Sequence, residues 1–208
     1  GVTGVQTCAL PIWRAINGWA SQDPHGALAW AKSQPEGARR QAFMAGAISG
    51  LAASDPVQAS ELFGALAAGE AQKVAAGQIA NVWARQDPVA AAQWVLQIAD
   101  PGARESALPH VVTSFAQSDV ARAAAWLEKL PAGSERDGAV VAYANTVTPR
   151  DPAGAAAWAA TVGDENKREN AVRSVYHQWK RTDESAANRW LADSPALSDD
   201  AKKRITGK

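Results

Sequence analysis

Six aspartates recur at a constant spacing of 32 residues in this chain of 208 residues, and they make up half of its twelve aspartates. A fixed period of about 20 to 50 residues is typical of a repeat protein, in which each repeat forms one small structural unit. The members of this series are Asp23, Asp55, Asp87, Asp119, Asp151 and Asp183. The spacing therefore predicts tandem repeats, and positions within a repeat are counted below from its aspartate.

The residues around each aspartate predict the start of a helix. An aspartate side chain accepts hydrogen bonds from the free N–H groups of the first helical turn, and its charge suits the positive end of the helix. Proline fits the first helical position. It follows the aspartate in four repeats, at Pro24, Pro56, Pro88 and Pro152. We therefore expect each aspartate to cap the first helix of its repeat.

One face of this first helix carries the same apolar residues in every repeat. Position +4 is always alanine, at Ala27, Ala59, Ala91, Ala123, Ala155 and Ala187. Position +7 is leucine in the second repeat and tryptophan in the others, at Trp30, Trp94, Trp126, Trp158 and Trp190. Positions +4, +7, +8 and +11 form one stripe of an α-helix, so we expect these residues in the core. The alternative is a row of tryptophans that binds a carbohydrate or an aromatic ligand.

A turn and a second apolar helix complete each repeat. Proline or glycine, which end helices, occupies position +12 in four repeats, at Pro35, Pro131, Gly163 and Pro195. The second helix closes with a large apolar residue four positions before the next aspartate, at Trp19, Leu51, Trp83, Phe115, Val147 and Trp179. Pro109 lies inside the second helix of the third repeat, so we expect a kink or a break near Leu108.

The predicted fold is all-α, a right-handed α-solenoid of tandem antiparallel helix–turn–helix repeats. A single hairpin cannot bury its own apolar face, whereas stacked hairpins can. The predicted hairpins cover residues 23–54, 55–86, 87–118, 119–150, 151–182 and 183–208, the last of them truncated. Residues 13–22 are expected to be the end of a preceding repeat, which makes the chain a fragment of a longer array.

The chain resembles the tetratricopeptide family of helical-hairpin repeats. In that family a proline closes one repeat and a tryptophan stands six residues further on, as in Pro24–Trp30, Pro88–Trp94 and Pro152–Trp158. The period here is shorter than the family's usual unit of about 34 residues, and the Leu-Gly pair that follows the tryptophan in the family is absent. The resemblance covers roughly residues 23–208. It implies a hairpin array that binds proteins or peptides.

The first residues of the chain do not follow the repeat. Residues 1–12 carry no charged side chain and resemble the translation of a sequencing adapter, so we expect a non-native leader. The alternative is a clipped signal peptide, although a basic start is missing and the apolar core is short. If the leader is non-native, the chain's single cysteine, Cys8, does not belong to the natural protein. Disulfides and thiol catalysis would then be excluded.

Charge and hydropathy restrict the classes of partner. The chain has 21 Lys or Arg and 21 Asp or Glu, which gives a formal net charge of zero. A protein that binds nucleic acid normally shows a basic excess or a basic stripe, so we expect no nucleic-acid partner. No apolar run has the length of a membrane span, so none is expected in this segment.

The sequence lacks the patterns that are typical of catalysis and of metal or cofactor binding. His25, His110 and His177 fall at unrelated positions of different repeats. Phosphate-binding glycine loops, nucleophile elbows and zinc-binding helix motifs are absent. Calcium needs several oxygens that converge on one point, whereas successive aspartates belong to successive hairpins. We therefore predict no enzyme activity, no cofactor and no metal site.

An arginine series at position +17 has two interpretations. Its members are Arg40, Arg104, Arg136 and Arg168, and Gln72 interrupts it. The first interpretation is structural: each guanidinium binds the free carbonyls at the end of the first helix and lays its stem on the core. The second is functional: the arginines bind the carboxylates of an acidic peptide. These four arginines are the candidate partner-binding residues.

The predicted function is that of a non-enzymatic helical-repeat scaffold, which binds a protein or peptide along one face. The alternative is a structural spacer or a regulatory array within a larger enzyme or envelope protein, whose functional domain lies outside this segment. A helical-toroid hydrolase is disfavoured, because that class needs carboxylates that converge across its helices.

Overall fold

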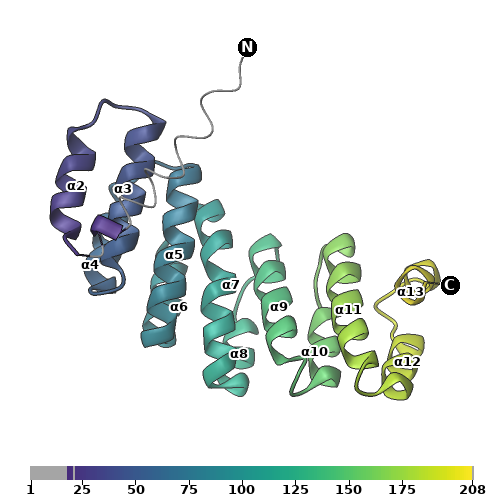
Figure 1. Ribbon diagram of the computed structural model, residues 1–208. Coiled ribbons are helices and arrows are strands. Elements are labelled where there is room, and N and C mark those ends of the chain that lie inside the picture. The colour runs from purple at the N-terminus through teal and green to yellow at the C-terminus, as the bar shows by residue number, and fades with distance from the viewer. Residues whose placement is uncertain (1–17, 21, 208) are drawn as a thin grey trace, which may run out of the picture. The chain divides into compact units, whose positions relative to one another are not determined.

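A computed structural model describes residues 18–20 and 22–207 of the chain (Figure 1). Within these residues the regular secondary structure is entirely α-helical, and no strand is present. The predicted all-α class is therefore confirmed. The predicted leader at residues 1–12, together with Cys8 and Trp13, lies outside the described residues.

Two helices follow each aspartate, in the predicted order. The first helices of the hairpins are α2 (Pro24–Ser33), α4 (Pro56–Phe63), α6 (Pro88–Gln97), α8 (Val120–Leu127), α10 (Pro152–Ala159) and α12 (Glu184–Asp193). The second helices are α3 (Ala38–Leu51), α5 (Glu70–Gln86), α7 (Pro101–Ser118), α9 (Ser134–Val147), α11 (Glu165–Lys180) and α13 (Asp199–Thr206). Each first helix thus begins at the residue after the aspartate.

Each aspartate of the series closes one helix and opens the next. The carboxylate of Asp23 accepts a hydrogen bond from the backbone N–H of Gly26 at 2.8 Å, and the five other aspartates cap their helices in the same way. The backbone N–H of Asp23 donates to the carbonyl of Trp19, four residues earlier, and its own carbonyl accepts from the N–H of Ala27. The predicted capping role is confirmed at all six positions.

Glycine is required at the start of three of the second helices. Gly37, Gly69 and Gly133 precede α3, α5 and α9, with φ angles of 140°, 140° and 147°. Side chains other than hydrogen strongly disfavour this region of backbone conformation. These glycines let the chain turn sharply from the first helix of a hairpin into the second.

The chain divides into two compact units, which are described separately: unit 1 ends at Ala107 and unit 2 begins at Leu108. The division falls within α7, close to Pro109. This proline lies inside the helix and does not end it, so the helix does not break near Leu108; the other expected outcome, a kink, stays a prediction.

Within each unit, every helix packs mainly against its near neighbours in the sequence (Figure 1). In unit 1, α3 contacts α2, α4 and α5, and α5 contacts α4 and α6. In unit 2, α9 contacts α8, α10 and α11, and α11 contacts α10, α12 and α13. The second helices of adjacent hairpins therefore pack against each other, as α3 does with α5 and α9 with α11.

The predicted apolar stripe forms much of the core. The alanines at position +4 are fully buried in all six hairpins. Tryptophan burial varies: Trp83, Trp94 and Trp179 are buried, whereas Trp19 and Trp30 are 39% and 37% exposed. Rings at the end of one hairpin pair with rings in the next first helix; the centroids of Trp83 and Trp94 lie 5.8 Å apart. At position +7 Trp94 is buried, Trp126, Trp158 and Trp190 are half-buried and Trp30 is exposed. The prediction of core tryptophans is therefore confirmed only in part.

Candidate functional site

Two of the four arginines in the series bind carbonyls at the end of their own first helix, as the structural interpretation expects. An Nη1 donor of Arg168 lies 2.9 Å from the carbonyl oxygen of Val162, and Nη1 of Arg104 donates to the carbonyl of Ile98. The amide of Gln72 donates to the carbonyl of Leu66 at 3.2 Å. All three acceptors stand at position +11. Glutamine therefore continues the series by the same contact, although the sequence pattern suggested an interruption.

The two remaining arginines of the series make different contacts. Nη1 of Arg136 lies 3.4 Å from the carbonyl oxygen of Thr161 in the next hairpin. Nη1 of Arg40 forms an ion pair with Glu36 at 3.3 Å, and its buried Nε has no hydrogen-bond partner. The contacts with carbonyls occupy several of the donors that a bound peptide would need. Binding of an acidic peptide by these arginines stays a prediction.

The residue after three of the four arginines carries a second structural role, which the sequence analysis missed. The carboxylate of Asp137 is 4% exposed and accepts hydrogen bonds from the backbone N–H groups of Gly163 and Asp164, at 2.8 and 2.9 Å. Gln41 accepts from the N–H of Ala67 at 3.1 Å. Each of these side chains thus connects its own hairpin to the next one through a hydrogen bond from a backbone N–H group. The signal was present in the sequence as Arg-Gln, Arg-Glu or Arg-Asp at positions +17 and +18.

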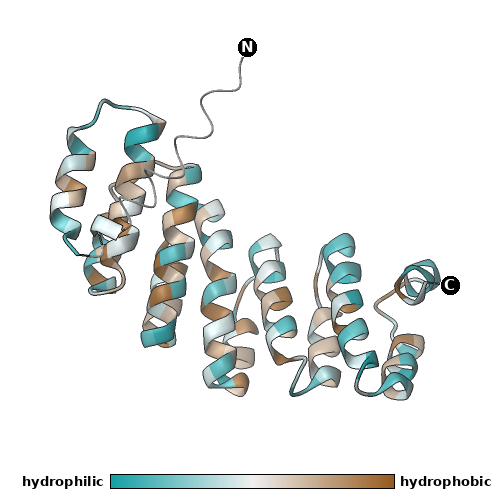
Figure 2. Ribbon diagram, viewed as in Figure 1, coloured by the Kyte–Doolittle hydropathy of each residue, from teal (hydrophilic) through white to brown (hydrophobic). Residues whose placement is uncertain are grey.

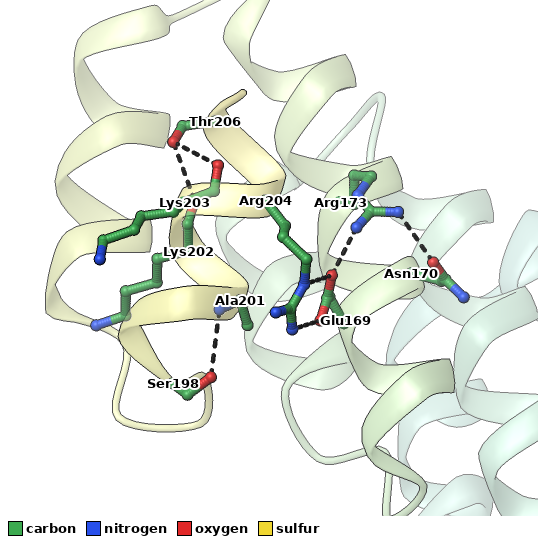
Figure 3. A network of polar contacts seen from close by, with 9 residues as sticks. All are labelled: Glu169, Asn170, Arg173, Ser198, Ala201, Lys202, Lys203, Arg204 and Thr206. Carbon is green, nitrogen blue, oxygen red and sulfur yellow. Dashed lines mark hydrogen bonds and ion pairs between the residues drawn. The ribbon is translucent and has the colours of Figure 1, made fainter. Parts of the chain in front are cut away.

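Glu169 occupies the same position +18 and joins α11 to α13 (Figure 3). Its side chain accepts from Nε and Nη2 of Arg204 at 3.0 and 2.5 Å, and from Nη2 of Arg173 at 2.6 Å. Hydrogen bonding to Arg204 lowers the pKa of Glu169 below its ordinary value, and the charges of both arginines act in the same direction. Glu169 is therefore an ionised, almost buried acceptor that holds α13 on α11.

A shallow apolar groove lies between α3 and α5 of unit 1. Its walls are mainly alanine, it has a volume of about 340 Å³, and it is here called the alanine groove. The lining residues are Ala38, Gln41, Ala42, Ala45, Ala67, Ala68, Gly69, Glu70, Ala71 and Val74. Val74 is 37% exposed. Glu70 also lines the groove, is exposed and forms no ion pair with another described residue.

A larger and more polar groove lies in unit 2, between α11, α12 and α13. It has a volume of about 710 Å³ and is here called the lysine groove. Its charged lining residues are Lys180, Glu184, Asp199, Lys202 and Lys203. The rest of the lining is Tyr176, Asn188, Leu191, Ala192 and Thr206. The hydroxyl of Tyr176 donates to Oδ1 of Asn188 at 2.7 Å.

The histidines and acidic residues are not gathered into a metal site in the part of the chain that the structure describes. His177 contacts the ring of Tyr176, with 5.3 Å between the ring centroids, and is otherwise exposed. Over the same residues, no helix is both long enough and apolar enough to cross a lipid bilayer.

Comparison of the chain with known protein families, with curated proteins and with solved structures gives no match. The resemblance to tetratricopeptide repeats therefore rests on the proline and tryptophan spacing alone. The two grooves and the hydrogen-bond series are the features from which a function can be argued.

Proposed function

We propose that the chain is a non-enzymatic scaffold of stacked helical hairpins, a right-handed α-solenoid of the tetratricopeptide type, that binds a protein segment. The stacking is supported by the contacts between second helices of adjacent hairpins within each unit. It is also supported by the side chains at positions +17 and +18, several of which bind the loop of the following hairpin. A hairpin array offers an extended surface for partner binding.

The alanine groove of unit 1 is the observation that carries the binding role. Ala38, Ala42 and Ala45 stand four and three residues apart, so they form one stripe along about two turns of α3. Ala71 and Val74 provide a similar stripe on α5. Small residues on both walls allow a third helix to approach closely, as in ordinary helix packing. Exposed apolar surface of this kind favours partner binding.

The chemistry of the groove favours an amphipathic helix as the bound segment. The apolar walls suit a leucine or an aromatic anchor, which commonly dominates the free energy of binding at an interface. Glu70, which has no ion-pair partner among the described residues, suits a lysine or arginine beside that anchor. The proposed partner therefore presents an apolar stripe flanked by a positive charge.

The test compares two exposed valines of unit 1. Val74→Asp places a charge in the alanine groove, whereas Val57→Asp places the same charge on α4, where Val57 is 54% exposed and does not line the groove. A helical peptide with leucines at every third and fourth position and flanking lysines serves as the probe. We expect Val74→Asp to weaken its binding by about tenfold or more, and Val57→Asp to leave it unchanged.

Equal binding by both variants would contradict a role of the alanine groove. Absence of binding by the unmodified chain would favour the alternative, that the hairpins act as a spacer or regulatory array of a larger protein. Circular dichroism of both variants should show the helix content of the unmodified chain, so that a loss of binding is not a loss of fold.

A further inference from the structure

We propose that the exposed tryptophan pair of the first hairpin, Trp19 and Trp30, binds the guanidinium of an arginine side chain from a partner protein segment. The two rings stand at positions −4 and +7 of the repeat, with their centroids 6.2 Å apart and their planes at 63°. Neither ring lines the alanine groove. The site is therefore separate from the surface on which the proposed function rests.

The first hairpin leaves its ring pair far more open than the other hairpins leave theirs. Trp19 is 39% exposed, whereas the residues at position −4 of the five other hairpins are at most 9% exposed. Trp30 is 37% exposed, whereas its equivalents at position +7 are buried or half-buried. Among the residues that it describes, the structure places no cation of the chain over either ring. Both indoles are therefore accessible to a ligand.

The fourth hairpin shows which group such a ring pair accepts. There Phe115 and Trp126 stand at the same two positions, with their centroids 6.5 Å apart. The guanidinium carbon of Arg122, at position +3, lies 5.7 Å from the centroid of the Phe115 ring. A guanidinium at this distance is attracted to the face of an aromatic ring, and tryptophan attracts a cation more strongly than phenylalanine does. The chain itself thus supplies a guanidinium to one pair of this kind.

In the first hairpin a carboxylate takes the place of that arginine. Position +3 is Gly26, and a Cβ there would lie 2.1 Å from Oδ2 of Asp23. Oδ1 of Asp23 accepts the capping hydrogen bond from the N–H of Gly26, and no hydrogen bond from a described residue to Oδ2 is present. The backbone N–H of Asp23 donates to the carbonyl of Trp19 at 2.8 Å, which keeps the two residues together. An arginine at the rings can therefore also reach a carboxylate, which its planar guanidinium binds well.

Only the first of the six hairpins combines a ring pair at these positions with glycine at position +3. The ring pairs of the third and sixth hairpins have alanine there, at Ala90 and Ala186. In the fifth hairpin a Cβ at Gly154 would also lie 2.1 Å from the carboxylate of Asp151, but position −4 is Val147. The fifth hairpin thus has the same glycine and carboxylate without the ring pair, and serves as the matched control.

The surface around the rings suits a charged ligand that also has a flat face. Figure 2 shows hydrophilic as well as hydrophobic bands along α2, which carries Trp30. A guanidinium is planar and more weakly hydrated than an ammonium group, so it can lie on an indole and donate to a carboxylate at the same time. Arginine therefore fits this site better than lysine does.

An alternative explanation is that another apolar surface covers the two indoles. Binding would then depend on apolar contact and not on positive charge. Citrulline has the shape of arginine with a neutral urea in place of the guanidinium, so on this explanation it should bind as well as arginine. The two explanations therefore differ in how the site discriminates between these side chains.

The experiment titrates the full chain with Nα-acetyl-arginine methylamide at low salt and follows the indole N–H signals of Trp19 and Trp30 by NMR. We expect saturable shifts of both signals at millimolar concentration, as suits a ligand of one residue, and weaker binding as salt screens the charges. The citrulline compound should bind about fivefold more weakly or less. Equal binding of citrulline, stronger binding of tetramethylammonium, or no saturable shift would each overturn the proposal.

Two matched glycine variants locate the site. Gly26→Arg supplies the guanidinium that the fourth hairpin already has, so it should weaken binding of the arginine compound by about fivefold or more through competition within the chain. Gly154→Arg makes the same change beside the same kind of cap, without a ring at position −4, and should leave binding unchanged. Equal binding by the two variants would contradict the site.

Two conservative variants test the ring and the carboxylate separately. Trp30→Leu introduces the residue that the second hairpin has at Leu62, and should weaken binding about fivefold, followed through the Trp19 signal. Asp23→Asn keeps a capping side chain and should weaken binding about two- to threefold, whereas Asp151→Asn should not. Unchanged binding by both Trp30→Leu and Asp23→Asn would overturn the proposal.

A variant of the alanine groove separates this site from the proposed function. Val74→Asp should leave the shifts of the Trp19 and Trp30 signals unchanged, because Val74 lines the alanine groove and the two tryptophans do not. Circular dichroism of every variant should show the helix content of the unmodified chain. Failure of the tryptophan pair and failure of the alanine groove are therefore observed separately.

Discussion

Units 1 and 2 follow the same repeat but are stabilised by different means. Residues 1–107 contain seven Lys or Arg and eight Asp or Glu, whereas residues 108–208 contain fourteen and thirteen. Among the described residues, the large apolar side chains with high exposure all belong to unit 1: Trp19, Trp30, Val57, Val74 and Leu96. Unit 1 thus combines few charges with exposed apolar surface, and unit 2 combines many charges with a covered core.

The difference indicates that the repeated residues specify where the helices begin, whereas the side-chain contacts between hairpins differ from repeat to repeat. Aromatic rings meet in both units, but in unit 1 one indole can contact two rings: Phe63 and Trp83 both contact Trp94, with centroids 5.5 and 5.8 Å away, whereas Trp158 in unit 2 pairs with Tyr143 at 5.4 Å. In unit 2 the buried carboxylates of Asp137 and Glu169 connect adjacent hairpins. We therefore expect unit 1 to be sensitive to loss of apolar volume and unit 2 to loss of polar partners.

The largest effect is expected for Trp94→Ala in unit 1. This indole is 8% exposed and touches rings from two helices, so its removal should lower the free energy of unfolding by about 3–5 kcal/mol. Trp190→Ala in unit 2, where the indole is half-buried, should cost clearly less. Urea unfolding of the two variants measures the difference. Equal losses would break the contrast between the units.

The second effect concerns the hydrogen bonds that side chains at position +18 accept from the next hairpin. Asp137→Ala in unit 2 leaves two backbone N–H groups without their acceptor and should cost about 2–3 kcal/mol. Gln41→Ala in unit 1 removes one neutral hydrogen bond and should cost about 1 kcal/mol. Hydrogen exchange at Gly163 and Ala67 would report each loop directly. A larger loss of stability for Gln41→Ala than for Asp137→Ala would contradict the view that unit 2 depends more on polar contacts between hairpins.

A smaller gain is expected for Gln72→Arg in unit 1. Gln72 donates to the carbonyl of Leu66, but its own buried Oε1 has no partner. Arginine would keep the donor, remove the unsatisfied acceptor and supply a charge-assisted hydrogen bond, for a gain of about 1 kcal/mol. Thermal unfolding against the unmodified chain is the measurement. A loss of stability would show that the pocket around Gln72 cannot hold the longer guanidinium.

The smallest effect concerns Glu169 in unit 2. The stability that its ionised side chain contributes should not change near neutral pH and should fall only in acid. Its pKa is lower in the folded chain than the ordinary value of 4.5, so the ionised form is favoured by folding. Its contribution to stability should be complete above that ordinary value and be lost as pH falls through the lower, folded pKa. The melting temperature of the unmodified chain minus that of Glu169→Gln should therefore shrink below about pH 4.5. Arg204→Gln should largely remove this pH dependence.

The helices and their caps could be predicted because they depend on residues close in the sequence. Asp151, Pro152 and the alanine at position +4 specify a helix start through contacts that span only a few residues. The same argument covers the turn glycines, whose backbone angles no other residue adopts readily. The structural role of Arg168 was also predictable, since its acceptor Val162 lies only six residues away.

The grooves could not be predicted, because they depend on side chains from helices that the repeat alone does not place. Lys180 and Lys203 are 23 residues apart and share a groove only after α11, α12 and α13 have packed. Burial of a given tryptophan also depends on its neighbours: Trp94 is covered by Phe63, whereas Trp30 remains partly exposed. The repeat assigned both indoles the same role.

Sequence patterns alone predicted the all-helical character of the described residues, the start of each first helix and the aspartate that caps it. The physical reason is that capping, turn geometry and helical periodicity are local. The exposed apolar surface of unit 1, the hydrogen bonds between adjacent hairpins and the positions of the two grooves emerge only when the helices have packed. Those properties depend on packing between helices, in which a residue's surroundings come from distant parts of the chain.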